Sequence, residues 1–252
     1  MPAHTDGAPP SLAVLLTGFL RHKAETFDAL RRHVLDPYGA SLFVATWDVS
    51  DSARAGVRED LLDPTIVTTH DVRAFYGDAL ADCRVRSYEL FERDVPRIAA
   101  RDRPFDVLST NERAQEHHTY WMDRLFAQWY IVRDGLAMIA EHERLTGRRF
   151  DLICRTRSDI RFDGDLPSWP ADRVLVANAL PGSMPADRGW VPDYFTIGPS
   201  DEIRKLADLC FAIEPLYDRQ NVDTTNAENL FAAFLVQRDV PVAVAEVPFT
   251  RL

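Results

Sequence analysis

Residues 150–162 have the sequence Phe-Asp-Leu-Ile-Cys-Arg-Thr-Arg-Ser-Asp-Ile-Arg-Phe. The stretch begins with an apolar run, Leu152 to Cys154, which is typical of a strand buried on both faces. Arg155, Arg157 and Asp159 follow, and because side chains alternate along an extended chain, they would share one side if the strand continued to Asp159. Charges there are costly unless they bind something polar. A diphosphate with a cation is such a ligand, because arginine forks grip phosphate oxygens and a carboxylate holds a metal.

Composition places the chain among ordinary globular proteins and narrows its partners. It has 252 residues, 46% of them hydrophobic and 27% charged, enough for one large domain or two small ones. A net charge of −10 argues against nucleic-acid binding and against docking on anionic lipid, and no apolar run approaches the roughly 20 residues that span a bilayer. Cys83, Cys154 and Cys210 are far apart, so we expect reduced cysteines in a cytoplasmic protein.

Domain organisation follows from the absence of linkers or repeats. Residues 1–10 have neither the basic start nor the apolar core of a signal peptide, so we expect a disordered tail. Residues 11–252 are expected to form a single domain.

Two buried strands at the start of the chain, residues 11–17 and 42–46, flank a helix that begins near residue 24. Such a unit predicts parallel strands, and ligands bind beyond the carboxyl ends of parallel strands. Trp47 is expected either to cover a base or ribose or to pack in the core, and Asp48 to accept a hydrogen bond from a nucleotide. The nucleotide-binding candidates at these two strand ends are Gly18, Phe19, Arg21, Thr46, Trp47 and Asp48.

The middle of the chain is less informative. We expect short strands at residues 65–69 and 84–88, helices at 71–80 and 88–100, and a long helix at 119–146 that Gly147 ends. His117 and His118 precede this helix, and a surface loop is favoured over a catalytic role because adjacent side chains point in different directions. The rest of the prediction consists of a strand at 173–177, a lid at 180–192, a helix at 226–237 and a strand at 240–247.

Residues 155–159, Arg-Thr-Arg-Ser-Asp, follow a long helix and a strand and resemble the signature of bacterial sugar-nucleotide glycosyltransferases of the GT-A fold. This resemblance implies a single GT-A-like, Rossmann-like α/β domain with a mostly parallel central sheet flanked by helices. The family carries an Asp-x-Asp metal motif, of which only Asp159 is kept here, because Arg157 stands at the first acidic position. Asp159 would therefore hold Mn²⁺ or Mg²⁺, and Arg155 would contact the diphosphate. The alternative is a surface ion pair between Arg157 and Asp159, which contributes little.

The same resemblance assigns roles to residues elsewhere. Asp193 stands where the family pattern places an acid near the reacting sugar, and Gln128 where polar side chains face the donor. Glu228 resembles the acid that opens a family helix, although a capping box with Thr225 explains it equally well. Asp193, Glu228 and Arg157 are the catalytic candidates. The literal Asp-x-Asp at residues 163–165 is expected to be a turn, with a fallback role in metal binding.

These expectations favour an enzyme that acts on a nucleoside-diphosphate sugar, with a GDP-sugar preferred, and that transfers the sugar to an acceptor. The alternative is a flavin-independent pyranose/furanose mutase on the same scaffold, since the chain is short, acidic and without an obvious acceptor domain. No Gly-x-Gly-x-x-Gly is present, so neither flavin nor NAD is expected. A non-catalytic binding domain is the third option.

Overall fold

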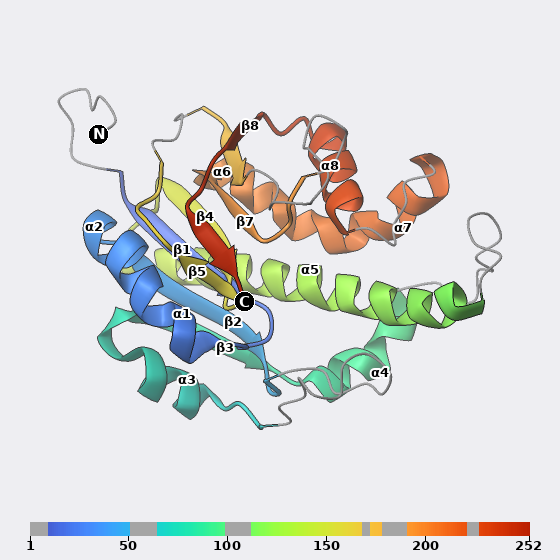
Figure 1. Cartoon of the computed structure of the whole chain (residues 1–252), viewed down its shortest axis with the longest axis horizontal. Helices are drawn as coiled ribbons and strands as arrows, with labels where there is room; N and C mark the ends of the chain where they lie inside the picture. Colours follow the sequence, from blue (N-terminus) through green and yellow to red (C-terminus); the bar gives the residue numbers. More distant parts are fainter. Residues whose placement is uncertain (1–9, 51–64, 99–111, 168–171, 178–190, 221–226) are drawn as a thin grey trace.

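The computed structural model describes residues 10–50, 65–98, 112–167, 172–177, 191–220 and 227–252 (Figure 1). Within these residues the fold is α/β, as predicted, with a seven-stranded, mostly parallel sheet and helices on both faces. The strand order is β3-β2-β1-β4-β7-β6-β8, and β5 and β9 form a separate two-stranded sheet.

The strands span β1 (Leu12–Thr17), β2 (Ser41–Trp47), β3 (Leu80–Arg86), β4 (Leu152–Arg157), β5 (Ile160–Phe162), β6 (Val174–Ala177), β7 (Phe195–Pro199), β8 (Val242–Ala245) and β9 (Phe249–Arg251). The α-helices span α1 (Lys23–Leu30), α2 (Asp36–Tyr38), α3 (Thr69–Tyr76), α4 (Tyr88–Ile98), α5 (Glu112–Thr146), α6 (Ser200–Arg204), α7 (Leu209–Gln220) and α8 (Ala227–Gln237).

One strand of the sheet is reversed. β1 pairs in parallel with both β2 and β4, but β7 runs antiparallel to its two neighbours, β4 and β6. The start of β7 therefore lies at the same sheet edge as the ends of β1 and β4. Residues that precede β7 in the sequence consequently meet residues that follow β4.

Two apolar layers cover the sheet. Alternate residues of β1 divide between them: Ala13 and Leu15 pack with α5, α7 and α8, whereas Val14 and Leu16 pack with α1 and α3. In α5, Gly135 permits close approach to the sheet, because a Cβ there would lie 2.6 Å from Leu15 Cδ1. The long helix is thereby fixed across the strands, with its N-terminal half at their carboxyl edge (Figure 1).

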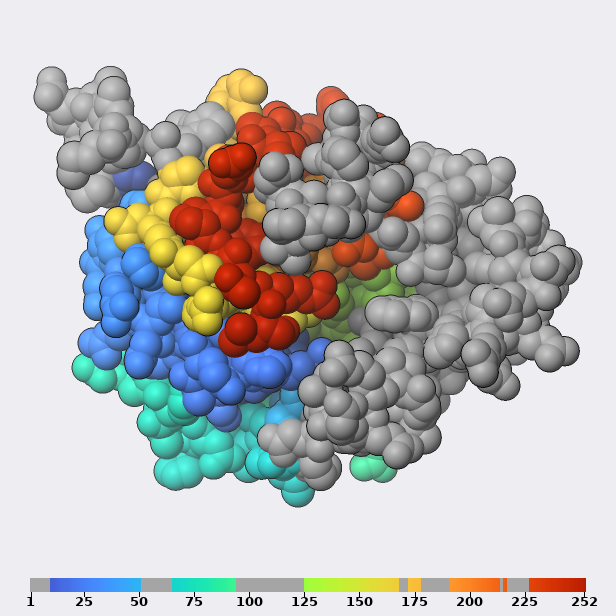
Figure 2. Space-filling view, viewed as in Figure 1, coloured from blue at the N-terminus to red at the C-terminus, as the bar shows by residue number. Residues whose placement is uncertain are grey.

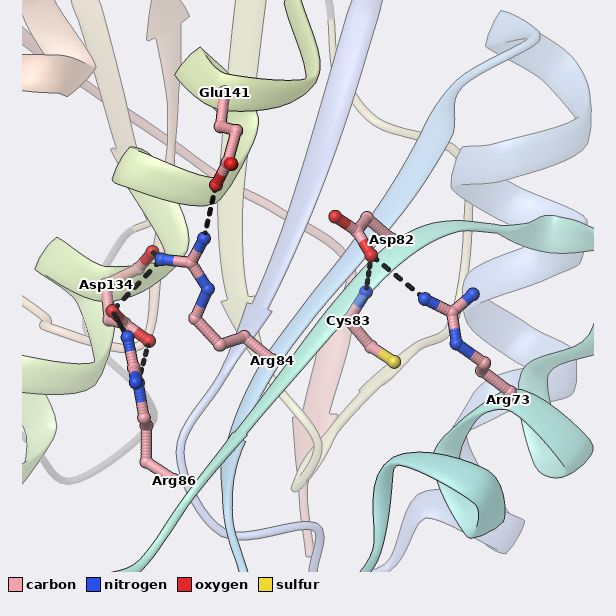
Figure 3. A network of polar contacts seen from close by, with 7 residues as sticks. All are labelled: Arg73, Asp82, Cys83, Arg84, Arg86, Asp134 and Glu141. Carbon is pink, nitrogen blue, oxygen red and sulfur yellow. Dashed lines mark hydrogen bonds and ion pairs between the residues drawn. The ribbon is translucent and has the colours of Figure 1, made fainter. Parts of the chain in front are cut away.

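β3 forms one edge of the sheet, and charged side chains tie it to α5 (Figure 3). Asp134 accepts hydrogen bonds from Arg86 Nε at 2.8 Å and from Arg84 Nη1 at 3.1 Å, and Arg84 also reaches Glu141 at 2.8 Å. Charged residues on an edge strand hinder pairing with another chain.

Two of the predicted elements are wrong. Residues 65–69 form no strand: Ile66 makes only a single bridge to Val49, and Thr68 caps α3 in a capping box with Asp71. The helix α5 begins at Glu112, so the backbone of His117 and His118 is helical and not a loop. The β5–β9 pairing was not predicted at all. The proposed tail at residues 1–10 falls outside the described residues except for Pro10.

Candidate active site

The candidate site lies where the direction of the chain changes within the sheet. From β1 the chain continues to β2 and β3 on one side, while β4 lies on the other side of β1. In open α/β sheets, ligands bind beyond the carboxyl ends of the strands at such a switch point. The loops after β1 and β4 meet here, because Ser158 Oγ donates to the carbonyl of Phe19 at 2.6 Å.

Arg155 is a buried cation near the end of β4, with 1% of its surface exposed. Its Nε donates to Thr17 Oγ1 at 3.1 Å, and its guanidinium lies 5.2 Å from the ring centroid of Trp129. Both terminal nitrogens, Nη1 and Nη2, lack a hydrogen-bond partner among the described residues. Burial lowers the pKa of Arg155 to about 10, so it remains charged at neutral pH. A buried charge with unsatisfied donors is costly unless a ligand satisfies them.

Arg157 and Asp159 form a bidentate ion pair at the end of the same strand. Arg157 Nε donates to Asp159 Oδ1 at 2.9 Å, and Nη2 donates to Oδ2. The alternative of a surface pair does not describe this geometry, since Asp159 is only 5% exposed. Burial opposes the charge of Arg157, but Asp159 and Asp193 outweigh it and raise its pKa.

Two carboxylates and an amide lie near the Arg157–Asp159 pair and come from three other segments of the chain. They belong to Asp193, Glu228 and Gln128. Gln128 Nε2, on α5, donates to Asp193 Oδ2 at 2.5 Å, and Arg157 Nη1 lies 4.0 Å from Asp193 Oδ1. Glu228 lies in the first turn of α8. Burial and the charge of Asp193 raise its pKa. Gln128, Arg157 and Asp193, which lie far apart in the sequence and were all predicted site residues, thus meet.

Arg251 is a site residue that the sequence did not reveal. It lies on β9, which pairs with β5, and its Nε is 3.7 Å from Asp159 Oδ2. Figure 2 shows the C-terminal segment beside the segment that contains β5. Arg21 also belongs here, because its charge helps to lower the pKa of Asp159. These arginines and carboxylates form one cluster. We define this cluster as Arg21, Arg155, Arg157, Asp159, Asp193, Glu228 and Arg251.

The turn after β1 has the expected glycine. Gly18 adopts φ +102°, a conformation that side chains rarely tolerate, and its N–H donates to the carbonyl of Ala45 at 3.3 Å. Phe19 is half-buried, with Arg21 over its ring at 5.3 Å. The turn therefore places the aromatic face of Phe19 beside Arg21 of the cluster.

Thr46 and Trp47, at the end of β2, are buried in the core, and the following Asp48 binds the start of a helix. Trp47 is 1% exposed and packs against Tyr88 and Phe91. Of the two positions expected for Trp47, it therefore has the one in the core. Thr46 is buried, and its hydroxyl donates to the carbonyl of Trp47 at 3.4 Å. Asp48 Oδ1 accepts from the N–H of Tyr88 at 2.8 Å, which places its charge at the N-terminus of α4.

The acidic residues of the cluster do not form a suitable set for a divalent cation. Both oxygens of Asp159 accept hydrogen bonds from Arg157, and the Nε of Arg251 lies 3.7 Å from Asp159 Oδ2. Burial would raise the pKa of Asp159, but Arg157, Arg251 and Arg21 lower it below the usual value. No group of three potential metal ligands occurs in the described part of the chain. Asp159, the expected ligand of Mn²⁺ or Mg²⁺, is thus already surrounded by cations.

The two aspartates of the fallback metal site at residues 163–165 bind different protein side chains. Asp163 accepts from Thr250 Oγ1 at 2.6 Å and from Arg161 at 2.9 Å, while Asp165 lies 2.9 Å from His33 Nδ1. The predicted lid at 180–192, apart from its last two residues, and Thr225 of the capping box lie outside the described residues.

Comparison with family models gives no match to this sequence, and comparison with curated proteins gives none either. In the described part of the chain, no helix is long and apolar enough to cross a membrane. Geometry and charge are therefore the basis for assigning a function.

Proposed function

We propose that this protein is an enzyme that acts on a nucleoside-diphosphate sugar and cleaves the bond between the anomeric carbon and the diphosphate. The supporting observation is Arg155, a fully buried guanidinium that is held by Thr17 and Trp129 with two donors unsatisfied. An anionic ligand with several oxygens satisfies such donors, and phosphate suits the planar fork of arginine. Glycosyl transfer to an acceptor is the reaction that this arrangement supports best.

The arginines would act on the leaving group. Negative charge grows on the diphosphate as the anomeric bond breaks, and fixed cations in a site of low dielectric stabilise that charge more than water does. Arg155 and Arg157 lie on one side of β4 with their charged groups at the carboxyl edge of the sheet. Arg155 has little freedom to move, so stabilisation by its charge requires little reorganisation.

The carboxylates would act on the sugar. Asp193 is 3% exposed and already accepts from Gln128, which fixes its orientation. Carboxylates and amides bind sugar hydroxyls, and a carboxylate beside an acceptor hydroxyl removes its proton. Asp193 is therefore our candidate base, and Glu228 orients the sugar.

One observation favours the mutase alternative. Burial and the charge of Asp193 raise the pKa of Glu228, so its carboxyl group holds a proton more tightly than an ordinary glutamate does. Exchange of ring oxygens at the anomeric carbon needs a proton donor on the enzyme, and it needs no acceptor substrate. A cytoplasmic location fits either reaction, because all three cysteines are buried and unpaired.

Product analysis separates the two reactions. GDP- and UDP-sugars are incubated with the enzyme, first alone and then with a panel of sugar acceptors, and products are identified by anion-exchange chromatography and NMR. An isomeric sugar nucleotide formed without acceptor supports the mutase, whereas glycosylated acceptor with released nucleoside diphosphate supports the transferase. Absence of both nucleotide binding and turnover with every donor would contradict the proposal.

Arginine geometry gives a second test. Arg155→Lys and Arg157→Lys keep the charge but lose the planar fork. We expect each to weaken diphosphate binding by about tenfold or more, since hydrogen bonds to charged groups contribute roughly 1.5–3 kcal/mol. Arg173→Lys, at an exposed pair with Asp172, is the control and should bind as the wild type does. Calorimetric affinities that are unchanged in both cluster variants would rule out this diphosphate site.

A further inference from the structure

The acidic position that would hold a metal is instead enclosed by guanidinium groups. Asp159 Oδ2 accepts from Arg157 Nη2 and lies 3.7 Å from Arg251 Nε, so two cations already share one carboxylate oxygen. A divalent cation on the same oxygen would be repelled by both at short range. Carboxylate and phosphate offer the same bidentate partner to an arginine fork.

We propose that Arg157 and Arg251, gathered by Asp159, take the place of a divalent cation, so that a nucleoside diphosphate binds this site without metal. The inference rests on the proposed function and deepens it, since it assigns Arg251 as a further diphosphate ligand and Asp159 as an internal counter-ion. When the diphosphate enters, its oxygens replace the Asp159 carboxylate on the Arg157 fork. No covalent bond changes in this step.

The backbone around Asp159 supports this role. The carbonyl of Asp159 accepts from the N–H of Leu252 at 2.9 Å, and Ile160 pairs with Arg251 in the β5–β9 sheet. Arg251 is therefore fixed to the same loop as the carboxylate that it faces. Its side chain is 45% exposed, which leaves room for it to turn from Asp159 to a ligand.

The two-stranded β5–β9 sheet provides a matched control. Arg161 lies on β5, is exposed to a similar degree, and pairs through its Nε with an aspartate at 2.9 Å. That aspartate is Asp163, which is not part of the cluster. Arg251→Ala and Arg161→Ala therefore remove the same group from the same small sheet, but only the first removes a cation from the diphosphate site.

Calorimetry with GDP and UDP tests the inference, with enzyme treated with EDTA and with enzyme supplied with Mn²⁺ or Mg²⁺. We expect the wild-type Kd to be the same with and without metal, Arg251→Ala to weaken binding by about tenfold, and Arg161→Ala to leave it unchanged. Asp159→Asn should bind more tightly in EDTA, because the competing carboxylate is removed. Thermal melting confirms that each variant folds, and Arg251→Ala decides the test if Asp159→Asn does not fold.

The opposite results are equally clear. Binding that requires a metal, weaker binding by Asp159→Asn, or equal losses in Arg251→Ala and Arg161→Ala would each overturn the inference while leaving the proposed function intact. If the wild type binds neither nucleotide with or without metal, the proposed function fails and this inference fails with it.

Discussion

Arg155 occupies a strand position where its neighbours in register are Leu15 of β1 and Thr196 of β7. A leucine there would extend the apolar layer below α5 at no cost in desolvation. The arginine instead needs a hydroxyl from Thr17 and an aromatic face from Trp129, and it still leaves two donors unsatisfied. Buried cations without full pairing destabilise a fold. The cost is explained if ligand binding completes the pairing, as the proposed function requires.

Glu228 supplies a prediction about pH. Burial and Asp193 raise the pKa of Glu228 in the folded protein above its ordinary value of 4.5. The neutral form is therefore favoured by folding, and this contribution is fully present below pH 4.5 and lost as pH rises through the folded pKa. We expect Glu228→Gln to be more stable than the wild type at pH 8, with the difference vanishing near pH 4, as measured by urea unfolding.

The control for this experiment is Glu141→Gln, because Glu141 is half-exposed and bound to Arg84. It should show no stabilisation at pH 8. A stability difference for Glu228→Gln that stays constant from pH 4 to pH 8 would show that its carboxyl group does not carry the proposed coupling.

At the scale of elements, the attachment of the edge strand β3 to α5 depends on Asp134 (Figure 3). Its side chain is 12% exposed and accepts from two arginines, whereas Glu141 is 53% exposed and pairs with one. We expect Asp134→Ala to lower the free energy of unfolding by about 2 kcal/mol, because both arginines lose hydrogen bonds to a charged partner, although Arg84 keeps Glu141. Glu141→Ala should cost less than about 1 kcal/mol. Urea unfolding measures both, and equal losses would contradict this account.

The sequence predicts elements well where local pattern decides them and poorly where distant pairing does. The apolar runs of β1, β2 and β4 were recognised because each is buried on both faces. The strand predicted at residues 65–69 is wrong, because Thr68 caps α3 in a capping box although these residues are rich in β-branched side chains. The place of Arg251 could not be predicted, because it follows from the pairing of β9 with β5, about ninety residues away.

The residues of the cluster also differ in whether a local sequence pattern could predict their positions. Arg155, Arg157 and Asp159 are close in sequence, so their charge pattern at a strand end was visible. The contact of Asp193 with Gln128 depends on the reversal of β7, which no local pattern indicates. The family resemblance selected both residues, and the fold brings them together.

For the whole molecule, the proposed site joins segments from both ends of the chain. The cluster combines the turn after β1, the end of β4 and the turn that follows it, the segment that precedes β7, the first turn of α8, and β9, in a protein whose net charge is −10. A diphosphate bound by these residues should stabilise all of those segments at once. By linkage, GDP or UDP at 100 times its Kd should raise the free energy of unfolding by about 2.7 kcal/mol.

Hydrogen exchange locates that stabilisation. We expect slower exchange with the nucleotide in residues 155–160, 191–195, 227–230 and 249–252 together, since one ligand contacts groups from each. Residues 69–76 of α3 are the internal control, because α3 contributes no residue to the cluster, and their added protection should be no greater than global stabilisation gives. Protection confined to residues 155–160 would show that the arginines of β4 bind the nucleotide without the carboxylates and Arg251. The cluster would then not be one site, and the assignments of Asp193, Glu228 and Arg251 would be wrong.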